Sequence, residues 1–282
     1  MSDKKTVVIT SAVRTAIGTL GGTLKNIPAY KLGSAVISSA IKKSNLKTSD
    51  INEIIMGQVL TGGTGQNPAR QAAMDSGVPK ETPSYVVNQV CGSGLRSIAS
   101  GFHSILSDNS KIVLTGGQES MSQAPHVAHL RNGKKLGDTE LIDSMIKDGL
   151  WDAFNGYHMG ITAENVAQQF QVTRKDQDKF AFESQMKALK AQKENKFDEE
   201  IIPYEIQLKK GNATFKKDEH PRANASLETL GRLKGAFKKD GTVTAGNASG
   251  INDGAAAVVL MSKEESEKRG IKPLAEIKSW AS

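Results

Sequence analysis

Short apolar runs alternate with helix-like segments over the first 119 residues of the chain. The apolar runs predict four strands, at 6–10, 54–56, 85–90 and 112–114. From Leu32 to Ile41, apolar residues recur three and four positions apart, which is the spacing of a helix with one buried face. Successive strands joined by helices predict a layered α/β domain, with a mostly parallel mixed sheet flanked by helices on both faces.

Capping residues mark helix ends at two places. Asn67 can cap a helix, Pro68 fits its first position, and Gly77 stands where a helix commonly stops. Further along, the segment 173–176 has a capping-box pattern, which predicts a helix that continues to about Asn195.

The composition of the sequence changes between residues 120 and 244, where residues are more polar and more often charged and few segments resemble strands. We predict a mainly helical second unit over this range, inserted into the α/β domain that 1–119 and 245–282 form. The apolar run 255–261 predicts the return to a core strand.

Cys91, the single cysteine, is the first candidate for chemistry. It lies between the apolar run 85–90 and a helix whose apolar stripe begins at Leu95. Gly92 and Gly94 allow a sharp turn, and the unpaired N–H groups of a first helical turn stabilise a thiolate. A lone cysteine is more often a buried apolar residue, yet this strand-turn-helix setting favours a nucleophile.

Composition places the chain among ordinary globular proteins. Its 282 residues suit about two domains, and no apolar stretch approaches the roughly 20 residues that span a bilayer. No targeting peptide is recognisable before the first strand. A single cysteine excludes an internal disulfide and a zinc site built from several thiolates, so we expect a reducing compartment and a cytoplasmic location.

The net charge of +7 suits an anionic partner without naming one. Between residues 205 and 240, nine Lys or Arg stand against five Asp or Glu, which fits a solvated surface as well as a phosphorylated ligand or nucleic acid. A glycine-rich loop follows at 242–254. Its backbone N–H groups and the Ser249 hydroxyl can contact a ligand, and a purely structural turn is the alternative.

Five blocks of sequence resemble the thiolases, most closely the biosynthetic acetyl-CoA acetyltransferases. The blocks are GQNPARQAA at 65–73, NQVCGSG at 88–94, GGQESMS at 116–122, GYHMG at 156–160 and GNASG at 246–250. They follow the family's order and cover nearly the whole chain. The resemblance implies a thiolase-like fold in which 120–244 is an inserted loop domain that binds CoA and forms tetramers.

The family's reaction gives Cys91 a role. A thiolase cysteine takes the acetyl group of one acetyl-CoA as a thioester, and the carbanion of a second acetyl-CoA attacks it to give acetoacetyl-CoA. The resemblance therefore implies an acetyl-CoA C-acetyltransferase, which runs this Claisen condensation and the reverse thiolysis through an acyl-thioester on Cys91. CoA thioesters are the substrates, and neither a permanently bound cofactor nor a metal is implied.

Eight further positions match residues that line the CoA and acyl sites of the family. They are Leu150, His158, Met159, Arg222, Phe237, Ala245, Ala248 and Ser249. By the resemblance, Ser249 contacts pantetheine, Ala245 and Ala248 line its channel, and Arg222 lies near the adenine end. The other four are implied to form the acyl and pantetheine pocket. Residue type alone would make His158 an ordinary polar histidine.

CoA also accounts for the local basic excess, because it carries a diphosphate and a ribose phosphate. Nucleic acid is the weaker alternative, since the basic residues are not interleaved with aromatic ones, which make up only 5% of the chain. Segment 129–135 resembles the loop through which thiolase dimers form tetramers. We therefore expect a homo-oligomer, dimer or tetramer, without nucleic-acid or membrane partners.

Half of the thiolase pattern has no counterpart in these 282 residues. Thiolases consist of two similar halves, and the second supplies an Asn-Glu-Ala segment, a Gly-His-Pro histidine and a Cys-x-Gly cysteine. Cys91 is the only cysteine here, and none of the five histidines follows that pattern. We therefore expect a truncated thiolase that lacks the C-terminal domain and is inactive alone.

Two related functions compete with this one. His158 and Met159 favour short-chain substrates over the longer ones of a 3-ketoacyl-CoA thiolase of fatty-acid degradation. A non-catalytic CoA-binding remnant of the fold would bind CoA without forming an adduct on Cys91.

Overall fold

The computed structural model of the chain describes residues 5–208 and 211–282, which fall into two compact units. Unit 1 contains the described residues of Met1–Gln123, Glu199–Lys217 and Asn252–Ser282. Unit 2 contains Ala124–Asp198 and Asp218–Ile251.

Three stretches fall in a different unit from the one that the sequence predicted. Residues 120–123 belong to unit 1, in which the Ser122 hydroxyl donates to the Asp253 carboxylate. Glu199–Lys217 belongs to unit 1, because Ile201 pairs with Arg14 in the central sheet. The residues from 245 to Ile251 belong to unit 2, in which the Asn247 amide is hydrogen-bonded to a helix of that unit.

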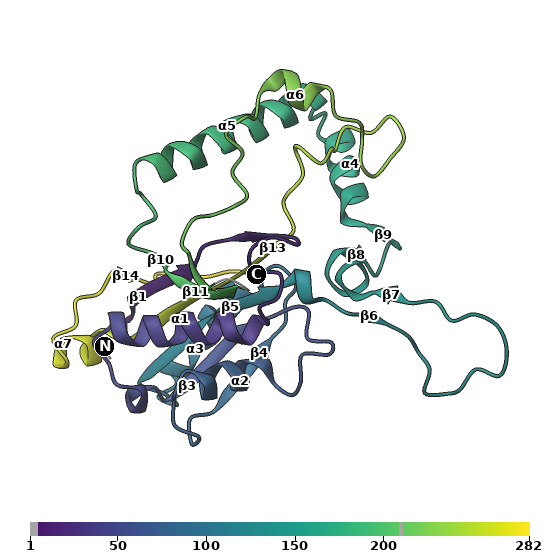
Figure 1. Cartoon of the computed structure of the whole chain (residues 1–282). Coiled ribbons are helices and arrows are strands. Elements are labelled where there is room, and N and C mark those ends of the chain that lie inside the picture. Colours follow the sequence, from purple (N-terminus) through teal and green to yellow (C-terminus); the bar gives the residue numbers. More distant parts are fainter. Residues whose placement is uncertain (1–4, 209–210) are drawn as a thin grey trace. The chain divides into compact units, whose positions relative to one another are not determined.

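Unit 1 is built around one mixed sheet of eight strands among the described residues (Figure 1). In spatial order these are β10 (Ile201–Ile202), β1 (Val7–Thr15), β13 (Asn252–Ser262), β5 (Ile112–Ser120), β3 (Glu53–Gly57) and β4 (Ser84–Val87), with β14 (Ala275–Glu276) beside β1 and β2 (Gly18–Thr19) beside β13. The predicted class, an α/β fold with a mixed sheet flanked by helices, is confirmed.

The central strand β13 changes the expected balance of strand directions. β3 runs parallel to both β4 and β5, as predicted for strands joined by helices. β13 is antiparallel to both of its long neighbours, β1 and β5, so the sheet is not mostly parallel. The preference for parallel pairing concerns strands joined by one crossover, whereas the chain passes through unit 2 before it enters β13.

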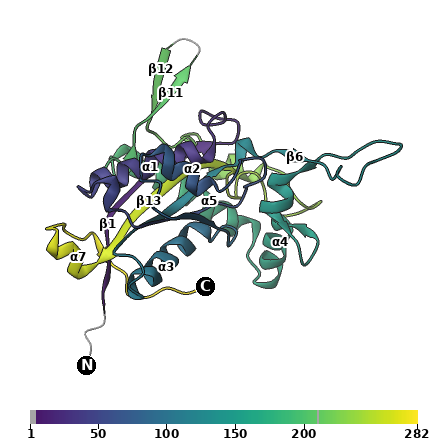
Figure 2. The same ribbon diagram turned by 90° about the horizontal axis from the view of Figure 1, so that it is seen from below.

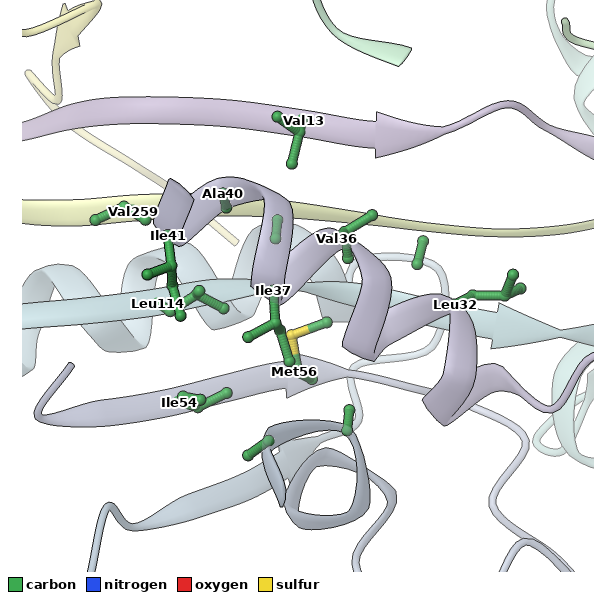
Figure 3. Packing of buried hydrophobic residues seen from close by; sticks show 14 of the residues in the cluster. Val13, Leu32, Val36, Ile37, Ala40, Ile41, Ile54, Met56, Leu114 and Val259 are labelled. Atoms are coloured by element: carbon green, nitrogen blue, oxygen red, sulfur yellow. The ribbon is translucent and has the colours of Figure 1, made fainter. Parts of the chain in front are cut away.

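Helices cover both faces of this sheet (Figure 2). α1 (Ala29–Lys43) and α2 (Pro68–Asp75) lie on one face, and α3 (Ser93–Leu106) lies on the other. The apolar stripe that the sequence predicted is the buried face of α1, as Figure 3 shows. Its members and the strand residues in the same cluster include Leu32, Val36, Ile37, Ile41, Ile54, Met56, Leu114 and Val259.

The predicted helix ends are confirmed at the level of single hydrogen bonds. Asn67 Oδ1 accepts from the backbone N–H of Arg70 at 3.1 Å, and Gly77 takes the left-handed φ of 78° after α2 ends. The predicted capping box begins α5 (Arg174–Lys193), which ends two residues before Asn195.

Unit 2 is not purely helical. Its elements are β6 (His126–Val127), β7 (Ile142–Asp143), the π-helix η3 (Met145–Leu150), β8 (Trp151–Asp152), β9 (Tyr157–His158), α4 (Met159–Gln169), α5 and α6 (Leu227–Gly231). Unit 1 also contains the hairpin of β11 (Tyr204–Leu208) and β12 (Gly211–Phe215), the short α7 (Lys263–Lys268), and the 3-10 turns η1 (Thr48–Asp50) and η2 (Met121–Gln123). None of the helices within the described ranges is both long and apolar enough to cross a membrane.

Candidate active site

Cys91 lies in the turn between β4 and α3 and is exposed. The predicted strand 85–90 stops at Val87, and α3 begins at Ser93 with Gly92 as its N-cap residue. The thiol is therefore two residues from the N-terminus of α3. The sequence prediction of a strand-turn-helix setting holds, with a longer turn than expected.

Three residues after the end of β4, Val90 takes a left-handed φ of 48°, which is unusual for a β-branched residue. Such a conformation costs on the order of 1–3 kcal/mol and persists only where neighbouring groups hold it. Three hydrogen bonds do so here. Val90 N–H donates to Asn88 Oδ1 at 2.9 Å, while Ser93 Oγ accepts from Gln89 N–H at 2.9 Å and donates to the Val90 carbonyl at 2.5 Å.

Glycines let the start of α3 approach the sheet, backbone against backbone. A Cβ on Gly57, the last residue of β3, would lie 2.3 Å from the carbonyl carbon of Ser93 and 2.5 Å from the nitrogen of Gly94. On β5, a Cβ on Gly117 would lie 3.4 Å from the Gly94 Cα. Buried Ser97 donates from Oγ to the Gly94 carbonyl at 2.7 Å. The turn that carries the thiol is thus fixed to two central strands.

Glu119, at the end of β5, holds the loop that follows β3. Its carboxylate accepts from the N–H groups of Val59 at 2.8 Å and Leu60 at 3.1 Å. Burial raises the pKa of Glu119, against the effect of these two hydrogen bonds. Asn88 Nδ2 donates to the Val59 carbonyl at 3.5 Å, so the same loop also contacts the turn before Cys91.

In unit 2 the structure brings His158 and Phe237 into contact. Their rings stack with centroids 4.7 Å apart and planes 21° apart. His158 Nδ1 accepts from the Gly160 N–H at 3.0 Å, so the neutral ring carries its proton on Nε2. Gly160 has no room for a side chain, because a Cβ there would lie 2.2 Å from the Phe237 ring. His158 of the GYHMG block thus stacks on Phe237, and its Nε2–H is the ring group that can donate to a ligand.

The remaining residues of the predicted acyl pocket lie close by in the chain. Met159 is the first residue of α4, directly after His158, and is 43% exposed. Leu150 is half-buried and precedes Trp151, which pairs with His158 between β8 and β9. The structure therefore gathers these candidates around the β8–β9 pair.

Arg222, Ala245 and Ala248 line one pocket of about 200 Å³ in unit 2. The pocket is completed by Gln185, His220, Asn224, Ala225, Thr229, Leu230, Leu233 and Gly246. The Arg222 N–H donates to Gln185 Oε1 at 2.9 Å, which anchors this strand-free segment to α5. Ser249 is exposed one residue beyond Ala248 and is not among the lining residues.

Sequence reasoning missed two buried carboxylates that anchor the glycine-rich loop. Glu164 on α4 accepts from the N–H groups of Thr242 and Val243 and from the Thr242 hydroxyl. Burial opposes ionisation, but these hydrogen bonds outweigh it and hold the pKa of Glu164 below its ordinary value. Asp178 on α5 accepts from Asn247 Nδ2 at 2.9 Å. Nothing in the sequence distinguishes either residue from the solvated acids around it.

Cys91 belongs to unit 1, and the other eight predicted site residues belong to unit 2. In the parts of the chain that the structure describes, no cluster of three or more His, Cys, Asp or Glu side chains could hold a metal ion.

Known proteins match nearly the whole chain. A family model described as the N-terminal domain of thiolases matches residues 7–264. Acetyl-CoA acetyltransferases of Rhizobium meliloti (strain 1021) and Cupriavidus necator are 53% and 54% identical to it, over 98% of this chain and 70% of each relative. The crystal structure of the Bacillus anthracis acetyl-CoA acetyltransferase superposes with a TM-score of 0.94 at 41% identity, and covers 97% of this chain and 70% of that one.

Proposed function

Because this chain belongs to the thiolase family, we propose that it carries the acyl-transfer site of an acetyl-CoA C-acetyltransferase, with Cys91 as the nucleophile. The observation that carries the proposal is the placement of the thiol. Cys91 is exposed at the N-terminal end of α3, in a turn held by Ser93 and seated against Gly57. Activated cysteine nucleophiles occupy partly exposed sites of this kind at helix N-termini.

In the first half-reaction the Cys91 thiolate attacks the carbonyl carbon of acetyl-CoA. A new S–C bond forms, the CoA thiolate leaves, and it takes up the proton that Cys91 released on ionising. In the second, the carbanion formed at the methyl group of another acetyl-CoA attacks the acyl carbon. A C–C bond forms, the S–C bond to Cys91 breaks, and acetoacetyl-CoA is released, while the departing Cys91 thiolate takes up a proton in place of the one that the methyl group lost. A thioester suits both steps, because thiolates form it readily and carbon nucleophiles attack it readily.

We assign binding of the CoA moiety to unit 2. The residues that line the pocket include small Ala245 and Ala248 and the basic Arg222, a combination that suits a ligand with phosphate groups. The exposed Ser249 hydroxyl beside it can bond to an amide of pantetheine. His158, stacked on Phe237, offers its Nε2–H to a thioester or amide oxygen.

The covalent step can be tested by intact-protein mass spectrometry after incubation with acetyl-CoA. We expect one added acetyl group, lost in Cys91→Ala and mapped to Cys91 by peptide analysis. Calorimetric binding of CoA in the absence of any adduct would replace this proposal with a non-catalytic CoA-binding protein of the same fold.

These 282 residues should accept an acetyl group without sustained turnover. Cys91 is the only cysteine in them, and none of the five histidines stands in a Gly-His-Pro sequence. The carbanion step therefore has no second thiol to move its proton. Thiolysis of acetoacetyl-CoA by the purified chain, at a rate above that of Cys91→Ala, would contradict this expectation.

We further propose that copies of the chain associate through the exposed segment 129–135, which resembles the tetramer-forming loop of the family. Light scattering during size-exclusion chromatography should give the mass of a dimer or tetramer. Deleting the segment should reduce the tetramer, and a monomer mass for the unaltered chain at micromolar concentration would refute the proposal.

A further inference from the structure

Two stretches of chain in unit 2 form the walls of the pocket that Arg222 lines. One is the end of α6 and the turn after it, which contributes Leu230 and Leu233. The other is the glycine-rich loop at 245–248. The walls touch at Gly246, where a Cβ would lie 2.5 Å from Leu233 Cδ1 and 2.6 Å from Leu230 Cδ2. The pocket therefore keeps its shape only while both stretches are held in place.

One ion pair on α5 reaches both walls. Arg174 Nε donates to Asp178 Oδ2 at 2.8 Å, one helical turn along. A terminal nitrogen of Arg174 donates to the carbonyl oxygens of Leu230 at 2.7 Å and Leu233 at 2.9 Å. The other carboxylate oxygen of Asp178 accepts from Asn247 Nδ2 at 2.9 Å, within the opposite wall.

Asn247 carries the connection into the loop itself. Its Oδ1 accepts from the N–H of Thr244 at 2.7 Å, and its Nδ2 also donates to the carbonyl of Thr242 at 3.1 Å. The Thr244 hydroxyl in turn accepts from the N–H groups of Gly246 and Asn247. Removing this one amide side chain therefore removes the loop's hydrogen bond to Asp178 and two hydrogen bonds to the backbone of Thr242 and Thr244, whereas the bond from Gln177 Nε2 on α5 to the Thr242 hydroxyl remains.

The Arg174–Asp178 ion pair differs from an ordinary ion pair on the protein surface. The Asp178 side chain is only 7% exposed and that of Arg174 27% exposed, so each charge depends on the other and on its hydrogen bonds. Exposed pairs of the same i,i+4 type occur elsewhere on α5, as between Lys179 and Glu183, and contact no wall of the pocket. Burial and connectivity together single out the Arg174–Asp178 pair.

We propose that Arg174, Asp178 and Asn247 are positioning residues that hold the two walls of the CoA pocket at a fixed separation. This inference rests on the proposed binding of CoA to unit 2. It concerns residues that line no part of the pocket themselves and act through Leu230, Leu233 and the loop.

The test is calorimetric titration of CoA into the whole chain and its variants, with thermal unfolding measured on the same samples. Asn247→Ala should raise the CoA dissociation constant by about tenfold or more, the equivalent of one lost buried hydrogen bond. Asp178→Ala should weaken binding similarly. Asp178→Asn should be milder, because it keeps an oxygen for the Asn247 amide. Gln168→Ala removes an exposed amide of α4 and is the matched control.

The rate at which iodoacetamide alkylates Cys91 gives the second measurement, since that reaction does not use the CoA pocket. The proposal expects an unchanged alkylation rate with a raised dissociation constant, and partial rescue in Asp178→Asn. Lower thermal stability with an unchanged dissociation constant in Asn247→Ala and Asp178→Asn would show a purely structural network and overturn the inference. If the unaltered chain binds no CoA, the proposed function fails, and this inference fails with it.

Discussion

Replacing Gly57 by alanine tests whether the nucleophile turn is seated by direct contact between backbones. The added Cβ would lie 2.3 Å from the Ser93 carbonyl carbon, 2.5 Å from Gly94 N and 2.6 Å from the Ser93 oxygen. Ordinary contact begins at 3.4 Å, so β3 and the start of α3 must separate by about 1 Å. No side chain can rotate away to relieve this, because every clashing atom is a backbone atom.

Overpacking a well-filled interior costs about 1–3 kcal/mol, and a clash between two backbones belongs at the upper end of that range. We expect Gly57→Ala to lower the free energy of unfolding of unit 1, measured by urea denaturation, by ~3 kcal/mol. We also expect it to slow the alkylation of Cys91, because the turn is displaced. Gly94→Ala is the matched control, because its Cβ meets only the Gly117 Cα, at 4.0 Å. Equal stability of the two variants would refute the seating of the turn on β3.

Two further substitutions probe hydrogen bonds. Ser93→Ala removes the side chain that holds the strained turn and should destabilise the chain by ~1–3 kcal/mol and slow alkylation of Cys91, whereas Ser100→Ala on the same helix should do neither. The pKa of Glu164 is lowered in the fold, so its charge stabilises the chain at neutral pH, and this contribution is lost as the pH falls below the ordinary value of 4.5. In urea denaturation near pH 7, Glu164→Gln should therefore unfold with a free energy ~1–3 kcal/mol lower than that of Glu183→Gln. This difference in unfolding free energy should be smaller near pH 4. A difference that does not change with pH would contradict the stabilising role of the Glu164 charge.

The sequence predicts those elements of the fold whose signals are local. Asn67 and Gly77 mark the ends of α2 because a cap depends on one side chain and its own first or last turn. The antiparallel course of β13 depends on where the chain re-enters the sheet after unit 2, and no residue in 252–262 encodes that path. The same holds for Glu199–Lys217, whose place in unit 1 is set by the pairing of β10 with β1.

In the candidate site, too, the sequence predicts the features that depend on neighbouring residues and not those that depend on distant contacts. Cys91 is recognisable because the glycines around it and the helix after it are neighbours in sequence. The left-handed φ of Val90 cannot be recognised in the sequence, because valine disfavours this conformation and only the hydrogen bonds of Ser93 and Asn88 explain it. The role of Asp178 is equally unmarked in the sequence, because Asn247, which donates a hydrogen bond to it, lies far along the chain.

The two parts of the candidate site are positioned by different physical means, so their effects should separate. Backbone contact at Gly57 sets the thiol, whereas the buried charges of Asp178 and Glu164 set the loop that lines the pocket. Neither group of contacts contains a residue of the other. Changes at Gly57 should therefore alter alkylation of Cys91 with little effect on CoA affinity, and changes at Asp178 should do the reverse. The free-energy effects of combining the two should add, because additivity fails mainly for residues that share partners.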